Sequence, residues 1–250
     1  MIDRDADNGA QALRARVPDG LRLYVIGDIH GRRDLLVRLH DRIVADAEAA
    51  AGLKHTVIYL GDYVDRGPES FEVLDRLINE PLAGFDTIHL KGNHEDMMLA
   101  FLSGAAGSLW TGNGGIETLG SYGLQPPPTL FDGADLESLR YRLRRAIPSD
   151  HVRFLEGLRL CHTEGDYFFV HAGVRPGKPL ADQDPREMMW IRDPFLGSNA
   201  SFGKRVVHGH SPCAEPEVSW NRIGIDTGAC WTGRLTCLVL EGDAHRFLQT

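Results

Sequence analysis

Three short runs in the first hundred residues concentrate side chains that bind divalent cations. They are GDIHG (27–31), GDYVDRG (61–67) and GNHE (92–95). Each run follows a short apolar segment of the kind that forms a buried strand. Asp, His and Asn supply the oxygen and imidazole donors that metal sites use. Three such runs in order therefore predict a metal site built from successive strand ends.

The donors in these runs are well spaced for a shared ion. Asp28 and His30 are separated by one residue, and the glycines that flank them permit a sharp turn. Asp62 follows the second apolar segment, and a carboxylate is a natural bridge between two cations. Asn93 adds a neutral amide oxygen after the third. Taken singly, an Asp in such a place is more typical of a turn or a helix cap, but the set indicates one site.

Two later histidines extend the set. His171 stands in the run VHAG and His210 in the run HGHSP, each after an apolar segment. A histidine alone is usually only a hydrogen-bonded polar group. His208 lies within the expected strand, whereas His210 follows the glycine at its end. We therefore predict His210 as a ligand and His208 as a residue behind it.

The elements that must position these residues alternate between strand and helix. Such alternation predicts βαβ units and a largely parallel sheet. Ligands bind beyond the carboxyl ends of the strands in such sheets, which is where all three runs lie. The expected strands are 21–26, 57–60 and 87–90, and helical spacing of apolar residues covers 35–47, 71–78 and 97–102.

The second half of the chain is rich in expected strands. Their tight spacing predicts mainly antiparallel pairing in a second sheet. The overall prediction is an α/β fold, a two-sheet β-sandwich flanked by helices. The expected strands are 167–170, 205–207, 222–225, 235–240 and 245–248.

A different segment separates the two halves. Residues 103–160 hold a glycine-rich stretch, the break Pro126–Pro128 and a basic helical stretch over 136–147. We interpret this segment as a helical and loop cap inserted into a single domain of residues 21–250. Residues 1–20 are polar and mixed in charge, so they are expected to form a flexible lead-in without a secretory signal.

The composition is that of an ordinary globular protein, with 42% hydrophobic and 25% charged residues. A net charge of −8 argues against nucleic acid or an acidic membrane as partner, because both attract basic surfaces. No apolar run approaches the length of a membrane span. The four cysteines lack paired spacing, which predicts reduced thiols and a cytoplasmic location.

The set of motifs resembles the PPP-type phosphoprotein phosphatases of the calcineurin-like metallophosphoesterase superfamily, and most of all their bacterial and phage branch. The resemblance covers about residues 21–240. It is carried by the three opening runs, by His171-Ala-Gly and by Gly209-His210. The fold that it implies, a pair of central β-sheets flanked by helices, matches the prediction from the pattern.

The resemblance also implies two divalent metal ions. One is held by Asp28, His30 and Asp62, and the other by Asp62, Asn93, His171 and His210. Mixed nitrogen and oxygen donors suit manganese, iron or zinc better than magnesium. We expect manganese, with iron or zinc as alternatives.

Further roles follow for the residues beside the ligands. His94 is expected to protonate the leaving group, with Asp65 as the partner that the resemblance implies. Arg66, and by a looser match Arg192, are expected to grip phosphate oxygens. The chain lacks the CxxxxxR loop of cysteine phosphatases, which favours direct attack by water.

Three other residues receive structural interpretations, and one loop is expected to select the substrate. Glu95 is expected to cap or orient the helix that follows it, and Asp226 is expected to be structural, because the motif that contains it recurs in the family that the chain resembles. Trp190 is expected to be core or pocket wall. The loop that begins at Trp110 (WTGNGG), with Ser121-Tyr-Gly, is expected to line the cleft and select the substrate, although a plain connector is a close alternative.

The resulting functional hypothesis is a metal-dependent phosphomonoester hydrolase. The expected substrates are phosphoserine and phosphothreonine in proteins, with phosphotyrosine as a wider option. The alternatives are a symmetrical dinucleoside tetraphosphate hydrolase and a small-molecule phosphoesterase. The resemblance favours the protein phosphatase, because the symmetrical hydrolases replace the Asp of Asp-Arg-Gly and end the third motif with Asp, whereas this chain has Asp65 and Glu95. A non-catalytic binding module is disfavoured, because every ligand position and His94 are filled.

Overall fold

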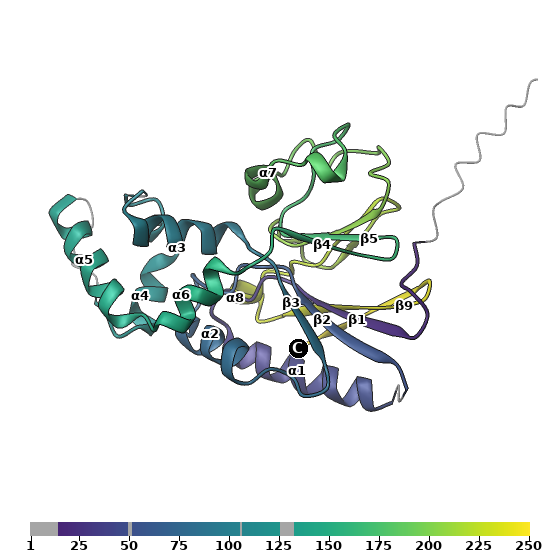
Figure 1. Cartoon of the computed structure of the whole chain (residues 1–250), viewed down its shortest axis with the longest axis horizontal. Coiled ribbons are helices and arrows are strands. Elements are labelled where there is room, and N and C mark those ends of the chain that lie inside the picture. Colours follow the sequence, from purple (N-terminus) through teal and green to yellow (C-terminus); the bar gives the residue numbers. More distant parts are fainter. Residues whose placement is uncertain (1–14, 50–51, 106, 126–132) are drawn as a thin grey trace, which may run out of the picture.

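The computed structural model describes residues 15–49, 52–105, 107–125 and 133–250. In this part of the chain, two five-stranded sheets pack face to face, with helices on the outside (Figure 1). The first sheet has the order β10-β9-β1-β2-β3, and the second β4-β5-β6-β8-β7. The predicted α/β sandwich with flanking helices is confirmed.

The first sheet provides the three strand ends that the opening motifs follow. Its parallel strands β1, β2 and β3 are extended by β9 and β10, which pair antiparallel to β1 and to each other. Side chains alternate between its faces, so that Leu23 packs against the second sheet and Tyr24 against the helices. The bounds are β1 (Leu21–Ile26), β2 (Lys54–Tyr59), β3 (Asp86–His89), β9 (Thr236–Glu241) and β10 (Ala244–Gln249).

The second sheet corrects the prediction of mainly antiparallel pairing. Strands β5, β6 and β8 run parallel, and only β4 and β7 pair antiparallel at the edges. Parallel pairing needs a long connection, and residues 171–204 supply one between β5 and β6. The strands 235–240 and 245–248 belong instead to the first sheet. The bounds are β4 (Cys161–Glu164), β5 (Tyr167–Val170), β6 (Arg205–His208), β7 (Glu217–Val218) and β8 (Arg222–Gly224).

Helices cover the outer face of each sheet. The first sheet is covered by α1 (Arg33–Glu48) and α2 (Ser70–Asn79), which provide Leu36 and Leu74 to the same core as Tyr24. The second is covered by η2 (Leu180–Asp182), α7 (Pro185–Trp190) and the loop after it, which carries the buried Phe195. A short helix, α8 (Ala229–Thr232), follows β8.

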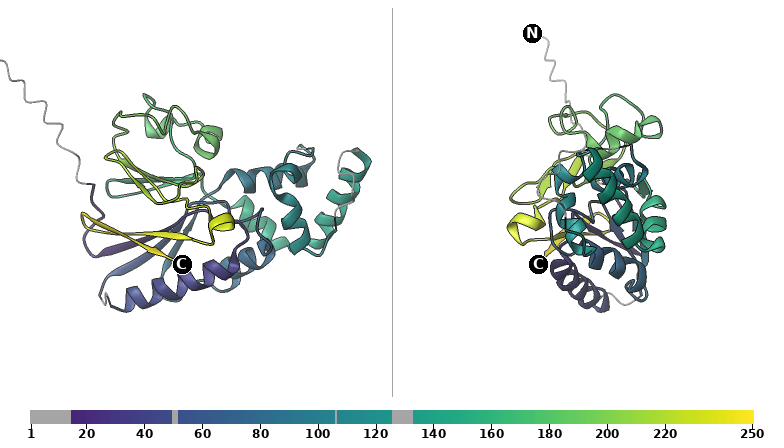
Figure 2. Two further views of the ribbon diagram at one scale, coloured as in Figure 1. Left: turned by 180° about the vertical axis from the view of Figure 1, so that it is seen from behind. Right: turned by 90° about the vertical axis from the view of Figure 1, so that its left-hand side faces the viewer.

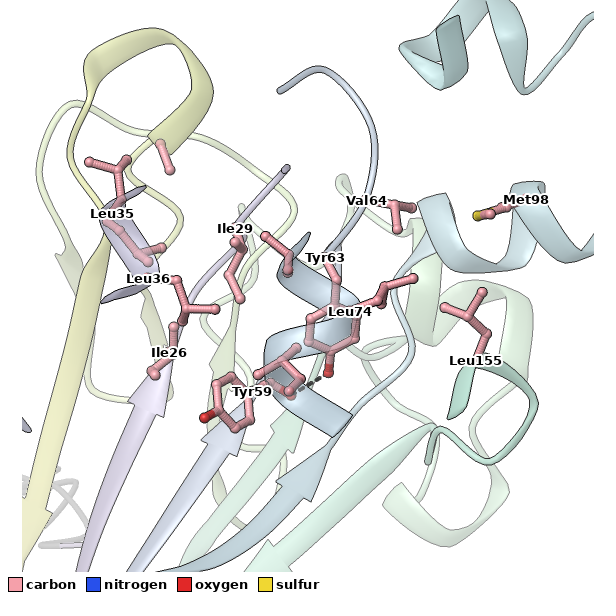
Figure 3. Packing of buried hydrophobic residues seen from close by; sticks show 14 of the residues in the cluster. Ile26, Ile29, Leu35, Leu36, Tyr59, Tyr63, Val64, Leu74, Met98 and Leu155 are labelled. Atoms are coloured by element: carbon pink, nitrogen blue, oxygen red, sulfur yellow. Dashed lines mark hydrogen bonds between the residues drawn. The ribbon is translucent and has the colours of Figure 1, made fainter. Parts of the chain in front are cut away.

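The predicted cap, residues 103–160, extends from the end of α3 to one side of the sheets (Figures 1 and 2). The buried hydrophobic residues of its described part belong to the same core as α1 and α2, as Figure 3 shows for Leu155 beside Met98 of α3. The break Pro126–Pro128 lies outside the described residues. The helices here are α3 (Asn93–Ser103), η1 (Thr111–Asn113), α4 (Gly115–Ser121), α5 (Gly133–Ala146) and α6 (Ser149–Glu156).

Residues 15–20 differ from the expected flexible lead-in. Ala15 and Val17 are buried between the sheets, and the Val17 amide donates to the carbonyl of Gly242 at 2.8 Å. Burial of these apolar side chains holds the segment in place. Residues 1–14 of the predicted lead-in lie outside the described residues. No helix in the described ranges has the length and apolar character needed to cross a bilayer.

The buried His40 on α1 predicts a loss of stability in mild acid. Arg76 Nε donates to His40 Nδ1 at 3.4 Å, and His40 Nε2 lies 3.0 Å from the Tyr59 hydroxyl. Burial, with the charge of Arg76, lowers the pKa of His40 to about 3. The unfolded chain, with its ordinary histidine pKa, therefore binds more protons between about pH 3 and 6.5.

As pH falls below 6.5, His40 alone is expected to reduce the free energy of unfolding by about 1.4 kcal/mol per pH unit. Urea unfolding of the wild type and of His40→Gln between pH 7 and 5 measures this slope. The variant should show the shallower dependence, since glutamine does not titrate. Equal slopes would show that His40 does not contribute.

Candidate metal centre

The carboxyl ends of β1, β2 and β3, together with those of β5 and β6 from the second sheet, bring the predicted ligands together. Asp62 lies in the middle. Its Oδ2 is 3.5 Å from His30 Nε2 and 3.4 Å from His171 Nε2. Two groups of potential donor atoms, each within 4.8 Å of one another, share this carboxylate. The groups are His30, Asp62 and His94, and Asp62, His171 and His210.

Several residues of the candidate metal centre have an unfavourable backbone conformation. Among the described residues, five non-glycine residues have positive φ, and all five are predicted site residues: His30, Asp62, Asp65, Arg66 and His210. The left-handed region is unfavourable for residues with a Cβ, and such strain gathers at functional sites. The loops therefore hold these side chains in place at a conformational cost.

Hydrogen bonds to carbonyls fix the direction of the two imidazoles. His30 Nδ1 donates to the carbonyl of Val64, and His171 Nδ1 to that of Leu60, both at 2.9 Å. A carbonyl can only accept, so each Nδ1 carries the proton. Each Nε2 therefore faces Asp62, and it is this nitrogen that would bind a metal after losing any proton it carries. Asn93 Oδ1 lies 3.0 Å from His171 Nε2, at the start of α3.

Buried negative charge gathers around this point. Asp28, Asp62 and Asp226 are almost inaccessible to solvent. Burial, reinforced by the charge of Asp226, raises the pKa of Asp28 well above its ordinary value. Burial also disfavours the charged form of Asp62, but His171 and His94 outweigh it and hold its pKa well below the ordinary range. Divalent cations fit this donor set, since they would neutralise these carboxylates and bind imidazole nitrogen as well.

Asp28 and His210 meet at the edge of the centre. Asp28 is not in either group of donors, and its carboxylate accepts the His210 amide at 3.0 and 3.2 Å. Gly209 passes so close that an added Cβ would lie 2.0 Å from Asp28 Oδ1. His208 turns away, with its ring against Phe195 and its Nδ1 on the carbonyl of Gly209. The structure thus brings His210, rather than His208, to the site.

Glu95 does more than cap α3. Its Oε2 accepts the amide of Gly92 at 2.9 Å, which completes the predicted cap. The same carboxylate accepts the amides of Asp62 at 2.9 Å and Tyr63 at 2.7 Å. Burial, together with Asp62, raises the pKa of Glu95 to about 7. One side chain therefore ties the loop after β2 to the loop after β3.

The two arginines lie beside ligand histidines. Arg66 Nη1 donates to His30 Nε2 at 2.6 Å. Arg192 Nε lies 3.3 Å from His210 Nε2, and its Nη2 donates to the His210 carbonyl at 3.3 Å. Both guanidinium groups are therefore placed to contact an anion bound between these histidines.

Two tryptophans flank the centre at the surface. Trp190 is 37% exposed and packs edge-on to His210 at 6.2 Å between ring centroids, in agreement with a pocket wall. Sequence reasoning missed Trp231, a residue that is 63% exposed and whose ring centroid lies 5.0 Å from the guanidinium carbon of Arg66. The sequence signal that could have pointed to Trp231 is that it follows the motif Ile225–Gly228 by three residues. Asp226 itself accepts the Gly228 amide at 2.9 Å and so holds this loop.

His94 and Asp65 form a buried pair beside Asp62. His94 Nδ1 lies 2.7 Å from Asp65 Oδ2, and His94 Nε2 lies 3.9 Å from Asp62 Oδ2. Burial lowers the pKa of His94, but Asp62 and Asp65 outweigh it and raise the value above the ordinary one. The imidazole is therefore positioned to carry a proton at Nε2, on the side that faces the site.

Trp110 contradicts the expectation that it lines the cleft. It is fully buried, and its Nε1 donates to both Asp65 oxygens at 3.0 Å. Thr118 Oγ1 donates to Asp65 Oδ1 at 2.7 Å. The physical reason is that a buried indole N–H needs an acceptor, and Asp65 supplies one. Gly112, Asn113 and Gly114 of the same loop are at least partly exposed.

Comparison with known proteins agrees with this geometry. The model of the calcineurin-like phosphoesterase family matches residues 21–238. The chain belongs to this family. It is therefore a metal-binding hydrolase that acts on phosphoric esters, of a family that uses a pair of divalent metal ions.

Two kinds of curated relative match along nearly the whole chain. The chain is 40% identical over 231 residues to serine/threonine-protein phosphatase 2 of Escherichia coli, covering 86% of this chain and 90% of that protein. It is 25% identical over 232 residues to the asymmetrical bis(5'-nucleosyl)-tetraphosphatase PrpE of Bacillus cereus, covering 87% and 90%. The sequence-based alternative was a symmetrical tetraphosphatase, whereas this relative is named for asymmetrical cleavage.

The fold is also that of solved structures. A cold-active protein-tyrosine phosphatase of a Shewanella species superposes with a TM-score of 0.58 at 16% identity. The match covers 99% of this chain and 89% of that one. This likeness concerns the fold and agrees with the two-sheet architecture.

The shared position of Asp62 predicts that one substitution affects two metal ions. Asp62→Asn keeps the shape and the Oδ1 acceptor but removes the negative charge common to both donor groups. We expect both metal affinities to fall together, by at least the roughly 10- to 100-fold that is typical when a residue supporting a ligand is lost. Metal analysis after dialysis against a graded chelator series measures both ions.

Asp96→Asn is the matched control, because Asp96 lies in the same region of the chain but on the partly exposed side of α3, paired with Lys91 at 3.5 Å. It should keep wild-type metal content. Full double occupancy in Asp62→Asn would contradict the bridging role.

Proposed function

We propose that this protein is a phosphomonoesterase that removes phosphate from phosphoserine and phosphothreonine in proteins, with phosphotyrosine as a further substrate. The observation that carries the proposal is the His94–Asp65 pair beside the Asp62 cluster. Such a pair assists the departure of an alkoxide, which is the poor leaving group that serine and threonine esters produce. The 40% identity to a serine/threonine-protein phosphatase supports the same substrate class.

The ligand set of the proposal keeps the sequence-based assignment. Asp28, His30 and Asp62 would hold one ion, and Asp62, Asn93, His171 and His210 the other. When bound, divalent cations supply Lewis acidity and lower the pKa of a water molecule. We propose manganese, with iron or zinc as alternatives, because mixed nitrogen and oxygen donors suit these ions better than magnesium.

Residues of the chain bind the phosphate group and protonate the leaving group. Arg66 and Arg192 bind the phosphate oxygens and orient the ester, because a guanidinium contacts such an anion with two parallel N–H groups. His94 donates its Nε2 proton to the leaving oxygen. Asp65 holds the imidazole by its Nδ1 and stabilises the charged form of the ring.

Two other substrate classes are alternatives to phosphoproteins. The second candidate is asymmetrical cleavage of a dinucleoside tetraphosphate, which the PrpE relatives favour by name. Hydrolysis of small phosphoesters is a third.

We also propose a cytoplasmic location, supported by four free cysteines at positions 161, 213, 230 and 237.

A direct comparison of substrates tests the proposal. With Mn²⁺ present, phosphoserine, phosphothreonine and phosphotyrosine peptides are compared with diadenosine tetraphosphate and bis(p-nitrophenyl) phosphate. We expect the highest kcat/KM for the phosphopeptides, because the proton donor benefits monoesters with poor leaving groups most. Hydrolysis of the dinucleotide alone would overturn the proposed substrate class and favour the second candidate.

A substitution at His94 tests the proton donor. His94→Asn should keep both metal ions but lower kcat for alkyl phosphates by about 10²- to 10⁴-fold. p-Nitrophenyl phosphate should be affected far less, since its leaving group needs no proton. Steady-state rates with both esters, together with metal content, measure the effect.

His162→Asn serves as the control for replacing a partly buried histidine, because His162 lies on β4 away from the cluster. It should leave both rates unchanged. Undiminished alkyl phosphate turnover in His94→Asn would remove His94 from the mechanism.

A further inference from the structure

The Asp65 carboxylate is held by more than its histidine. It is completely buried, and three side-chain groups reach it: His94 Nδ1 at 2.7 Å, Thr118 Oγ1 at 2.7 Å and Trp110 Nε1 at 3.0 Å. A carboxylate has about four acceptor positions. Most of that capacity is therefore used, and the plane of the carboxylate is fixed relative to the imidazole.

The backbone of Asp65 is held by the same neighbours. Its amide donates to Thr118 Oγ1 at 2.9 Å and to Ser70 Oγ at 3.0 Å, and the two hydroxyls lie 2.9 Å apart. Asp65 has a φ of 73°, an unfavourable conformation for an aspartate. These bonds stabilise a backbone position that would otherwise relax.

Both Trp110 and Thr118 come from the cap rather than from the sheets. Trp110 precedes η1, and Thr118 lies on α4, which packs on α2. The indole ring is itself fixed by Phe101, at 4.9 Å between ring centroids, and by Gly115, where an added Cβ would lie 2.6 Å from the ring. The N–H that reaches Asp65 is thus rigidly placed.

The same segment also contacts the neighbouring arginine. The Arg66 amide donates to the carbonyl of Gly114 at 3.0 Å. Gly114 has a φ of 103°, and an added Cβ would lie 2.7 Å from Arg66 Cγ. One stretch of the cap, residues 110–118, therefore touches both the partner of the proton donor and a predicted phosphate ligand.

We propose that Trp110 and Thr118 are positioning residues for the His94–Asp65 pair, so that the cap forms part of the catalytic apparatus. They act through Asp65 and do not touch the substrate. The inference rests on the proposed function, because it requires His94 to protonate the leaving group. Without these hydrogen bonds, the Asp65 carboxylate is free to rotate away from His94, and the imidazole is less well oriented toward the leaving oxygen.

The test separates orientation from stability. Thr118→Val and Trp110→Phe each remove one donor to Asp65, while Thr118→Ser keeps the hydroxyl. Tyr122→Phe is the matched control, since it removes a buried cap hydroxyl that lies 2.7 Å from His151 Nδ1 and has no contact with Asp65. Thermal unfolding and metal content are measured for all four variants.

The decisive measurement is the dependence of kcat on the pKa of the leaving group. A series of aryl and alkyl phosphates covers good and poor leaving groups. We expect Thr118→Val and Trp110→Phe to lower kcat for alkyl phosphates by about 10- to 100-fold and to change kcat for p-nitrophenyl phosphate little. Thr118→Ser should restore the alkyl rates. Tyr122→Phe should keep the wild-type profile even if its melting temperature falls.

A double substitution shows whether the effect passes through Asp65. Thr118→Val should lower kcat for alkyl phosphates much less in an Asp65→Asn background than in the wild type, because the carboxylate that Thr118 positions is already lost. Equal losses on both kinds of ester, or full additivity with Asp65→Asn, would overturn the proposal and leave Trp110 and Thr118 as core residues.

Comparison of the wild type with His94→Asn distinguishes failure of the positioning role from failure of the proposed function. If His94→Asn does not steepen the dependence on the leaving group, the proton-donor role fails and the positioning role fails with it. If His94→Asn steepens the dependence but Thr118→Val and Trp110→Phe behave as Tyr122→Phe does, only the positioning role is wrong.

Discussion

The burial of the Asp62 carboxylate at the junction of the two sheets is the constraint around which this structure is organised. A buried carboxylate is costly unless opposite charge and hydrogen bonds surround it. Imidazoles approach it from both sheets, His30 from the first and His171 from the second. Glu95 holds the backbone on either side of it. The left-handed conformations of the site residues follow, because only sharply turned loops direct so many donors toward one point.

The same constraint explains why the cap matters to the site. Residues of the cap share a core with α1 and α2, so it is not an independent attachment. Through Trp110 and Thr118 it reaches the buried carboxylate of Asp65, and through Gly114 it supports Arg66. Parts of the cap that were expected to select the substrate are instead placed behind the proton donor.

The relatives differ in substrate although the family is shared. One kind is named as a protein phosphatase and another as a dinucleoside tetraphosphatase. A fold and a metal site do not by themselves select a phosphate ester. The surface around the centre is where a choice can be made, and here it carries Trp190 beside His210 and Trp231 beside Arg66.

The sequence by itself predicted the three parallel strands of the first sheet and the candidate ligands that follow them, whereas β9 and β10 were expected in the other sheet. β1 is Leu21–Ile26 as predicted, because a strand buried on both faces reads as a continuous apolar run that ends at glycine. Parallel strands end at one edge, so three motifs after three strands had to converge. Only the tertiary structure decided how β5, β6 and β8 pair, since their long connections leave no local signal of direction. Only it brought Trp110 to Asp65, 45 residues away in sequence, because a hydrogen bond between distant segments depends on how the cap packs and not on the pattern of residues around either partner.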